Sequence, residues 1–304
     1  MSASAASSAT AAKIELILWK GSQFSHKAIA ALKLKGLLPV VHYTMVGGPD
    51  VRKPAEMKRL LPPPYTIPCM KWDDEVIAGS DHICAFLDEK IPLPPLYPQL
   101  DGIHDLEQRC SKLYWPNGFL SMYDSAGFDR FAGTTVRQYT KSNYKIAAPI
   151  LRLAPKTAWN IIHSVVKKDF VATMKRRNAS IQDERSVDVV YKMAREELAS
   201  LDKLLASSPT DFFAGATSPS AADLTLYAML ERWVGDSMQP GVHGPAQPKI
   251  LEGLAATERL FAQVKAAGGV DLTQVKDYPT LTTPLGNATY PKKAELDVTI
   301  KGGQ

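Results

Sequence analysis

Short apolar runs separated by one helical pattern open the chain. Residues 14–19 form a mainly apolar run of strand length, and residues 40–46 form a second run rich in β-branched and aromatic side chains. Between them, residues 25–36 place apolar side chains on one side and end on Gly36, a residue type that commonly terminates helices. The pattern predicts a strand–helix–strand unit whose strands pair in parallel through a right-handed crossover.

Two further strands and a helix complete the first ninety residues. Residues 66–72 and 75–78 have the apolar content of strands and flank the turn-forming pair Asp73 and Asp74. Because so short a turn joins them, we expect these two strands to pair in antiparallel fashion. Ser80 then begins the next predicted helix, since serine is favoured at helix N-termini.

A proline-rich stretch at residues 91–98 favours extended backbone and separates this part from a helical remainder. Apolar residues at spacings of three and four predict helices over residues 101–114, 157–177, 185–207, 221–235 and 250–267. We therefore expect a flexible leader at 1–12, a first domain at 13–91, a linker at 92–98, an all-helical domain at 99–270, and a tail at 271–304 that lies on the surface or stays mobile.

Composition agrees with a globular protein of two domains. The 304 residues are 45% hydrophobic and 22% charged, with a formal net charge of +5. The densest basic stretch, residues 167–177, is interpreted as a solvated helix face. Because no aromatic residues interleave with a basic face, we expect no binding to nucleic acid.

The cysteines favour a reducing compartment. Cys69, Cys84 and Cys110 are odd in number and have neither metal-site nor paired spacing, so we expect free thiols and no metal ion. Residues 146–166 come closest to a membrane-spanning length, but basic residues and prolines interrupt them. The uncharged leader lacks the basic start of a signal peptide. These features favour the cytoplasm.

The segment Ser22-Gln23-Phe24-Ser25 lies where the first helix is expected to begin. Helix N-termini present unpaired N–H groups and a partial positive charge. A hydroxyl there either caps the helix or donates a hydrogen bond to a bound thiolate, which favours the ionised form of that thiol. Both interpretations of Ser22 remain open at this point.

Two further motifs lie at the starts of predicted elements. The pair Ile67-Pro68 places a proline at the beginning of a strand, where the sheet tolerates it. Ser80 and Asp81 follow Gly79 at a helix N-terminus, which is a favourable place to bind a carboxylate.

The second half of the chain contains a capping box. Ser220 is followed three residues later by Asp223, directly before an apolar run. In such a box each side chain accepts a hydrogen bond from the main-chain N–H of the other residue. Its expected role is in folding rather than in catalysis.

These four signals occur in the order found in glutathione transferases, which the chain resembles over residues 14–268. The resemblance implies an α/β thioredoxin-like domain (βαβ–ββα) followed by an all-α helical bundle domain, a homodimer, and glutathione as co-substrate. It implies that Ser22 faces the thiol of glutathione. It places the other glutathione contacts at Ser25, at Ile67 with a cis-linked Pro68, and at Ser80 with Asp81.

Gly79 departs from the family pattern. The family usually carries an acidic or amide residue before the serine, and that side chain grips the ammonium group of glutathione. Asp81 is a candidate substitute, or it complements the helix dipole.

Residues 22–25 also align with the Cys-Pro-Phe-Cys of glutaredoxins and of the second type of membrane-associated prostaglandin E synthase. Serines replace both sulfurs here, so dithiol redox chemistry is not expected. The enlarged second domain is similar to that of this synthase and of its metaxin-like relatives.

Two functions are compatible with these residues. The leading one is a glutathione transferase that directs the thiolate at a small hydrophobic electrophile, with Tyr114, Trp115 and Tyr123 either lining the electrophile pocket or packing in the core. The alternative is a non-catalytic binding or scaffold protein of the same fold, favoured by Gly79 and the long tail. For residues 146–168, a packing helix is favoured over a position at a membrane surface.

Overall fold

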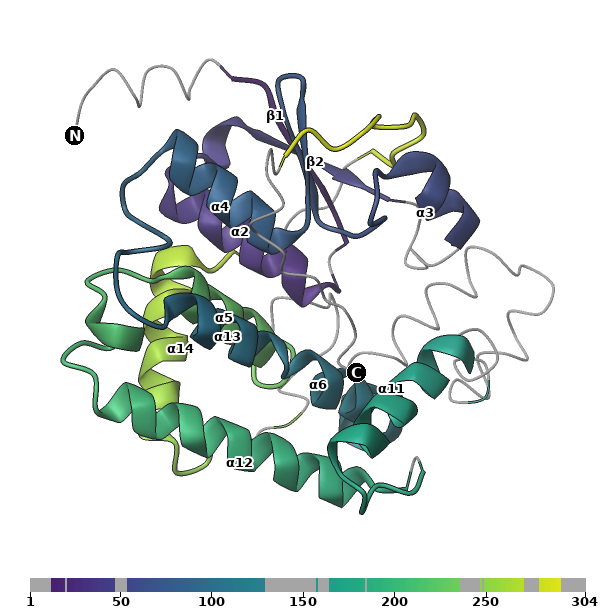
Figure 1. The fold of residues 1–304 in the computed structure, drawn as a ribbon, viewed down its shortest axis with the longest axis vertical. Helices are drawn as coiled ribbons and strands as arrows, with labels where there is room; N and C mark the ends of the chain where they lie inside the picture. Colours follow the sequence, from purple (N-terminus) through teal and green to yellow (C-terminus); the bar gives the residue numbers. More distant parts are fainter. Residues whose placement is uncertain are drawn as a thin grey trace.

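The computed structural model describes residues 12–19, 21–46, 54–128, 157, 164–183, 185–235, 247, 249–270 and 279–290 of the protein. Within these ranges, a mixed sheet and its helices form one part of the molecule, and a bundle of helices forms the other (Figure 1). Residues 1–11 of the predicted leader and most of the segment between residues 129 and 163 lie outside the described residues.

A four-stranded sheet organises the N-terminal domain. Its strands are β1 (Ile14–Leu18), β2 (Val41–Met45), β3 (Cys69–Trp72) and β4 (Glu75–Ala78). Their order is β2-β1-β3-β4. β1 pairs in parallel with β2, and β3 pairs in antiparallel fashion with both β1 and β4. The predicted thioredoxin-like arrangement of the strands is therefore confirmed.

The inner strand β1 places buried apolar side chains on both faces because both faces of the sheet are covered. Its Leu16 and Leu18 belong to the main core, whereas Ile17 belongs to a second, smaller core. The helices α2 (Gln23–Leu34) and α4 (Ser80–Lys90) pack against each other in the main core (Figure 1). The helix α3 (Pro54–Leu60) contributes to the second core through Met57 and Leu60.

The helical domain is built around one fully buried helix. Its described helices are α5 (Ile103–Ser111), α6 (Tyr114–Tyr123), α7 (Ser125–Gly127), α11 (Ser164–Arg177), α12 (Val187–Ala206), α13 (Ala221–Glu231) and α14 (Ala255–Gly268). All 11 residues of α13 are buried. A helix without a solvent-facing stripe belongs at the centre of a bundle, and α13 contacts α2, α5 and α14.

The helix α2 is shared by the two domains. It contacts α4 within the N-terminal domain, and it contacts α13 and α14 of the helical domain. Consequently its polar residues Gln23, Ser25, His26 and Lys27 are buried along with its apolar ones. The start of this helix is thus held by both domains.

The prediction of one helix over residues 101–114 is wrong at its C-terminal end. The helix α5 stops at Ser111, and a separate helix α6 begins at Tyr114 and reaches Tyr123. Pro116 lies in the first turn of α6, where proline is tolerated, whereas it would interrupt a helix continuing from residue 101. The proline therefore marks a helix start that the weak periodicity of the sequence concealed.

Two other helices are shorter than the pattern predicts. The helix α14 begins at Ala255 rather than at residue 250, because turns precede it and Gly253 has a positive φ of 77°. The helix α13 ends at Glu231 rather than at residue 235. The apolar periodicity continues into these turns because the turn residues Ile250 and Trp233 are also buried.

The predicted capping box is present at the start of α13. The Ser220 N–H donates to Asp223 Oδ2 at 2.8 Å, and the Asp223 N–H donates to Ser220 Oγ at 3.4 Å. The Phe213 N–H donates to the other carboxylate oxygen of Asp223 at 3.0 Å. The Ala221 N–H donates to the Leu96 carbonyl oxygen at 2.7 Å, which ties the proline-rich linker to this helix.

The described part of the C-terminal segment, residues 279–290, lies on the N-terminal domain (Figure 1, yellow). Thr280 forms a bridge with Met45 of β2, and Tyr290 forms one with Ile77 of β4. Leu281 is buried in the second core. Because β2 and β4 are the two edge strands, this segment shields both edges of the sheet.

Within the described ranges, no helix has the length and apolar character needed to cross a membrane.

The capping box generates a stability prediction. Ser220→Ala leaves the Asp223 N–H without its acceptor inside the bundle, so we expect the free energy of unfolding to fall by about 1–2 kcal/mol in urea titrations. Ser186→Ala, at the N-terminus of α12 where no side-chain cap bond forms, is the matched control and should change it by less than about 0.5 kcal/mol. Equal losses in the two variants would contradict the role assigned to the box.

Candidate functional site

Three chain segments meet at one end of the sheet. Ile17 of β1 lies opposite Cys69 of β3, and Cys69 lies opposite Ala78 of β4. The segments that follow β1, precede β3 and follow β4 therefore share that end of the sheet. The Gly79 N–H also donates to the Pro68 carbonyl oxygen at 2.9 Å. The structure thus brings together the sequence-predicted residues of these segments, Ser22, Ile67, Pro68, Ser80 and Asp81.

Ser22 is the N-cap of α2. Its Oγ accepts a hydrogen bond from the Ser25 N–H at 3.4 Å, and its backbone is extended, as is usual for a residue that caps a helix. Only 5% of Ser22 is exposed. A hydroxyl that accepts one hydrogen bond retains its own O–H as a donor. The capping role and a donor role toward a ligand are therefore compatible in this geometry.

Ser25 is placed differently from Ser22. It is fully buried, and its Oγ accepts a hydrogen bond from the Trp19 N–H at 3.3 Å. This bond joins the first turn of α2 to the residue that follows β1. Ser25 thus fixes the conformation of the segment that carries Ser22.

The Ile67–Pro68 peptide bond is cis, and Pro68 directly precedes β3. Across from it, Gly79 has a positive φ of 95°. This backbone conformation favours glycine over residues that carry a Cβ. The family usually has an acidic or amide residue at this position. The presence of glycine here is explained by the backbone conformation, which favours a residue without a Cβ.

Ser80 and Asp81 form the first turn of α4. The Ser80 Oγ donates to Asp81 Oδ1 at 3.3 Å, and the same oxygen accepts a hydrogen bond from Lys27 Nζ at 2.5 Å. The Asp81 side chain is 22% exposed, whereas that of Lys27 is 1% exposed. The carboxylate of Asp81 therefore connects the buried ammonium of α2 to the accessible end of α4.

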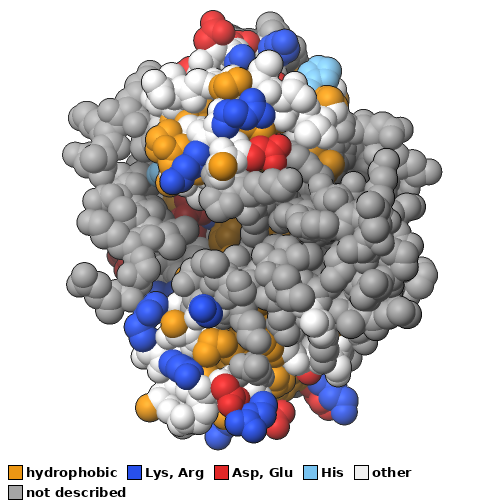
Figure 2. Space-filling view, turned by 90° about the vertical axis from the view of Figure 1, so that its right-hand side faces the viewer, with side chains coloured by type: hydrophobic (Ala, Val, Ile, Leu, Met, Phe, Trp, Pro, Cys, Tyr) orange, Lys and Arg blue, Asp and Glu red, His pale blue; other side chains and the backbone are white. Residues whose placement is uncertain are grey.

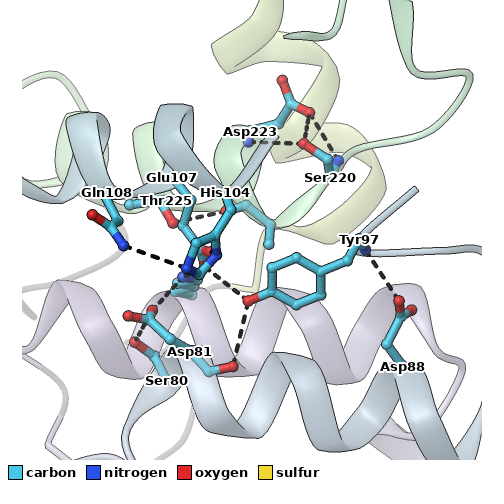
Figure 3. Close-up of polar contacts among 12 residues, drawn as sticks. Ser80, Asp81, Asp88, Tyr97, His104, Glu107, Gln108, Ser220, Asp223 and Thr225 are labelled. Atoms are coloured by element: carbon cyan, nitrogen blue, oxygen red, sulfur yellow. Dashed lines mark hydrogen bonds and ion pairs between the residues drawn. The ribbon is translucent and has the colours of Figure 1, made fainter. Parts of the chain in front are cut away.

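Glu107 of α5 is the second partner of Lys27 and comes from the helical domain. Its Oε1 also accepts a hydrogen bond from Tyr97 Oη at 3.0 Å, and its Oε2 lies 3.3 Å from His104 Nδ1. Figure 3 shows Asp81, Tyr97, His104 and Glu107 converging between the helices of the two domains. This buried ionic cluster joins α2, α4 and α5 beside the predicted site.

The two charges at the centre of the cluster hold each other ionised. Burial opposes ionisation of Glu107, but the Lys27 ammonium, the neighbouring His104 and the hydrogen bonds from Lys27 and Tyr97 lower its pKa from 4.5 to about 2. Burial likewise opposes the charge of Lys27, and the carboxylates of Asp81 and Glu107 nevertheless raise its pKa. A buried pair of this kind is costly to break, because the remaining charge loses its partner.

Sequence reasoning missed Glu107 and Tyr97. Glu107 shares the buried face of α5 with Ile103 and Cys110, at helical spacings of four and three. An acidic residue at such a position signals a buried partner. Its partner Lys27 lies 80 residues away in the sequence, so the pattern does not identify the pair.

Aromatic side chains lie next to the start of α2. Phe24, two residues after Ser22, packs against Tyr114 of α6 with ring centroids 5.3 Å apart, and Tyr114 packs against Trp115 at 5.2 Å. These residues and Tyr123 are partly buried. Figure 2 shows a hollow between the two parts of the molecule with hydrophobic and acidic side chains in its depth. Phe24, two residues after Ser22 in the first turn of α2, thus forms a partly exposed aromatic pair with Tyr114.

The thiols of the chain are poor candidates for nucleophiles. All three cysteines are free and buried, and burial raises the pKa of Cys69 and of Cys84 to about 12 and raises that of Cys110 as well. The Cys69 Sγ beside Pro68 donates to the Thr66 carbonyl oxygen at 3.1 Å. Any thiol chemistry at this site therefore depends on a thiol supplied by a ligand.

The buried ionic cluster generates a pH prediction. Glu107→Gln leaves the Lys27 ammonium with one carboxylate fewer, so we expect the free energy of unfolding to fall by about 3–5 kcal/mol near neutral pH. Glu107 contributes its stability above pH 4.5 and loses it as the pH falls toward 2, since its pKa is lower in the folded protein. The difference in the free energy of unfolding between wild type and Glu107→Gln should therefore decrease as the pH falls from 4.5 toward 2.

The matched control is Glu75→Gln. Glu75 pairs with Lys90 at 2.9 Å on the surface, with both side chains about 30% exposed, so its loss should leave stability nearly unchanged. If the difference in the free energy of unfolding between wild type and Glu107→Gln stays constant between pH 5 and pH 2, the charge of Glu107 does not stabilise the fold.

Part of the chain matches a known protein family. Residues 21–90 match the family model of the glutathione S-transferase N-terminal domain. No curated protein sequence matches the chain.

Solved structures with the same fold include a glutathione S-transferase from Rhodospirillum rubrum, with 15% identity, a TM-score of 0.51, and coverage of 89% of this chain and 96% of the other. The beta-etherase LigF from Sphingobium has 16% identity and a TM-score of 0.51, covering 87% of this chain and 100% of its own. FzlA from C. crescentus has 15% identity and a TM-score of 0.50, covering 90% and 96%.

At these identities the solved structures establish the fold alone. The chain therefore has the two-domain fold of glutathione S-transferases, and its residues 21–90 match the model of that family's N-terminal domain.

Proposed function

We propose that the protein is a glutathione transferase. The observation that carries the proposal is the convergence of Ser22, the cis Ile67–Pro68 peptide and Ser80 at one end of a glutathione S-transferase N-terminal domain. Glutathione is a tripeptide with a carboxylate at each end and a thiol between them, so it matches a site that has several separated polar segments.

Each segment has a distinct task in this proposal. The N-terminus of α4, at Ser80, receives the γ-glutamyl carboxylate through its unpaired N–H groups. The main chain at Ile67 pairs with the cysteinyl residue. The Ser22 hydroxyl, at the N-terminus of α2, donates a hydrogen bond to the thiolate and favours its ionised form.

The reaction is an attack of the glutathione thiolate on a hydrophobic electrophile. Glutathione supplies the nucleophile, while the protein supplies binding, orientation and a lowered thiol pKa. Phe24 and Tyr114 provide an aromatic surface beside Ser22 for the electrophile. No metal ion is required by this chemistry.

One observation favours the alternative of a non-catalytic binding protein. Asp81, the candidate substitute for the side chain missing at Gly79, is already bonded to Lys27 and Ser80. The ammonium group of glutathione would share the Asp81 carboxylate with the ammonium of Lys27, which already neutralises part of its charge. This reduces the attraction expected at that end of the ligand, and a direct measurement of activity separates the two functions.

The proposal predicts the effect of Ser22→Ala. Loss of a hydrogen bond to a charged sulfur should lower kcat/KM for conjugation of glutathione to an aromatic electrophile by about 10- to 100-fold near neutral pH. Because Ser22 also caps α2, thermal unfolding of the variant must be measured alongside, so that the rate is compared in folded protein.

Ser186→Ala is the control, since Ser186 accepts its hydrogen bond from the Gln182 N–H at 3.0 Å on the surface of the helical domain. It should retain full activity. Wild-type protein that neither conjugates nor binds glutathione would contradict the proposal, and wild-type binding without conjugation would favour the non-catalytic alternative.

A further inference from the structure

Arg232 of the helical domain reaches across to the start of α2. It follows directly after the last residue of α13 and is 6% exposed. Its guanidinium donates to Gln23 Oε1 at 2.8 Å and to the Gly21 carbonyl oxygen at 3.3 Å. These two acceptors stand on either side of Ser22. One side chain of the second domain thus holds both neighbours of the proposed thiolate donor.

The contact with Arg232 fixes the orientation of the Gln23 amide. A guanidinium is a donor only, so the amide oxygen must face it and the amide NH₂ must point elsewhere. Gln23 is 2% exposed, and within the described part of the chain its Nε2 has no hydrogen-bond partner. A buried donor without a partner is unfavourable and rare in folded proteins, and it calls for an acceptor.

The surroundings of this donor favour an anionic acceptor. Gln23 is the first residue of α2, a helix of 12 residues, and the helix N-terminus carries a partial positive charge. The Arg232 guanidinium adds a full positive charge next to it. A neighbouring anion would therefore gain a hydrogen bond from Nε2 and favourable electrostatic interaction at once.

We propose that Gln23 Nε2 is a second hydrogen-bond donor to the thiolate of glutathione bound beside Ser22, and that Arg232 is the positioning residue that presents this donor. The inference rests on the proposed function, because it needs glutathione at the start of α2. It assigns a role to a residue pair that spans the two domains, so the thiolate site is complete only when the helical domain is docked on the N-terminal domain.

The test is a pH titration of the full-length protein with glutathione bound, following the ultraviolet absorbance of the thiolate. Gln23→Met removes the donor with little change in side-chain size, and we expect it to raise the pKa of the bound thiol by about one pH unit. Arg232→Lys keeps the positive charge but cannot make the two directed bonds, so a similar rise is expected.

Arg195→Gln is the matched control. Arg195 also donates to two carbonyl oxygens, those of Ile250 at 2.7 Å and Glu252 at 2.8 Å, but both acceptors belong to the helical domain. This variant should leave the pKa of the bound thiol unchanged. Thermal unfolding of every variant separates loss of fold from loss of the donor. If Arg232→Lys does not fold, Gln23→Met alone still tests whether Gln23 Nε2 donates to the thiolate.

The possible outcomes separate this proposal from the proposed function. A bound thiol whose pKa is lowered in wild type and equally lowered in folded Gln23→Met overturns the role of Gln23 while the transferase proposal stands. An unchanged pKa in Arg232→Lys together with a raised one in Gln23→Met overturns the positioning role of Arg232. A wild-type protein in which bound glutathione titrates like the free tripeptide overturns both proposals.

Discussion

The buried ammonium of Lys27 is the constraint on which the arrangement of the two domains depends. It lies on α2, and its two carboxylate partners come from α4 in the N-terminal domain and from α5 in the helical domain. A buried charge cannot be left without partners at acceptable cost. The side chains of Asp81 and Glu107 must therefore reach Lys27 together, which couples α4 and α5 to α2. This requirement adds to the packing of the helical domain on α2, which is made by α13 and α14.

The same helix carries the start of the proposed site, so its position determines the chemistry. The first turn of α2 is held from within by Ser25, whose hydroxyl accepts from the Trp19 N–H, and from the second domain by Arg232. A donor that must meet a thiolate gains from being fixed before the ligand arrives, since little has to be ordered on binding. Contacts from two domains at one helix end provide this rigidity.

Elements that depend on local pattern were predictable from the sequence. The strands and α2 follow from mainly apolar runs and a glycine stop, and the capping box of Ser220 and Asp223 follows from its spacing. Elements that depend on distant contacts were not. Residues 279–290 lack periodicity, and their place on the sheet is determined by pairing with Met45 and Ile77, more than two hundred residues away.

The site divides in the same way. Ser22 and Ser80 were identified because serine at a helix start has a local meaning. Glu107 and Arg232 were missed because their importance comes from partners in the other domain, Lys27 and Gln23, which no spacing along the chain connects. Gly79 was interpreted as a lost side chain, whereas its positive φ shows a backbone requirement.

The most direct test of the central claim is to map where glutathione binds, using amide nitrogen–proton NMR spectra of the full chain recorded during a titration. The structure predicts that the largest shifts fall on the amides of residues 21–25, 67 and 79–81, which meet at one end of the sheet. Saturating shifts confined to other surfaces, or no shifts at millimolar glutathione, would contradict the claim that these three segments form one binding site.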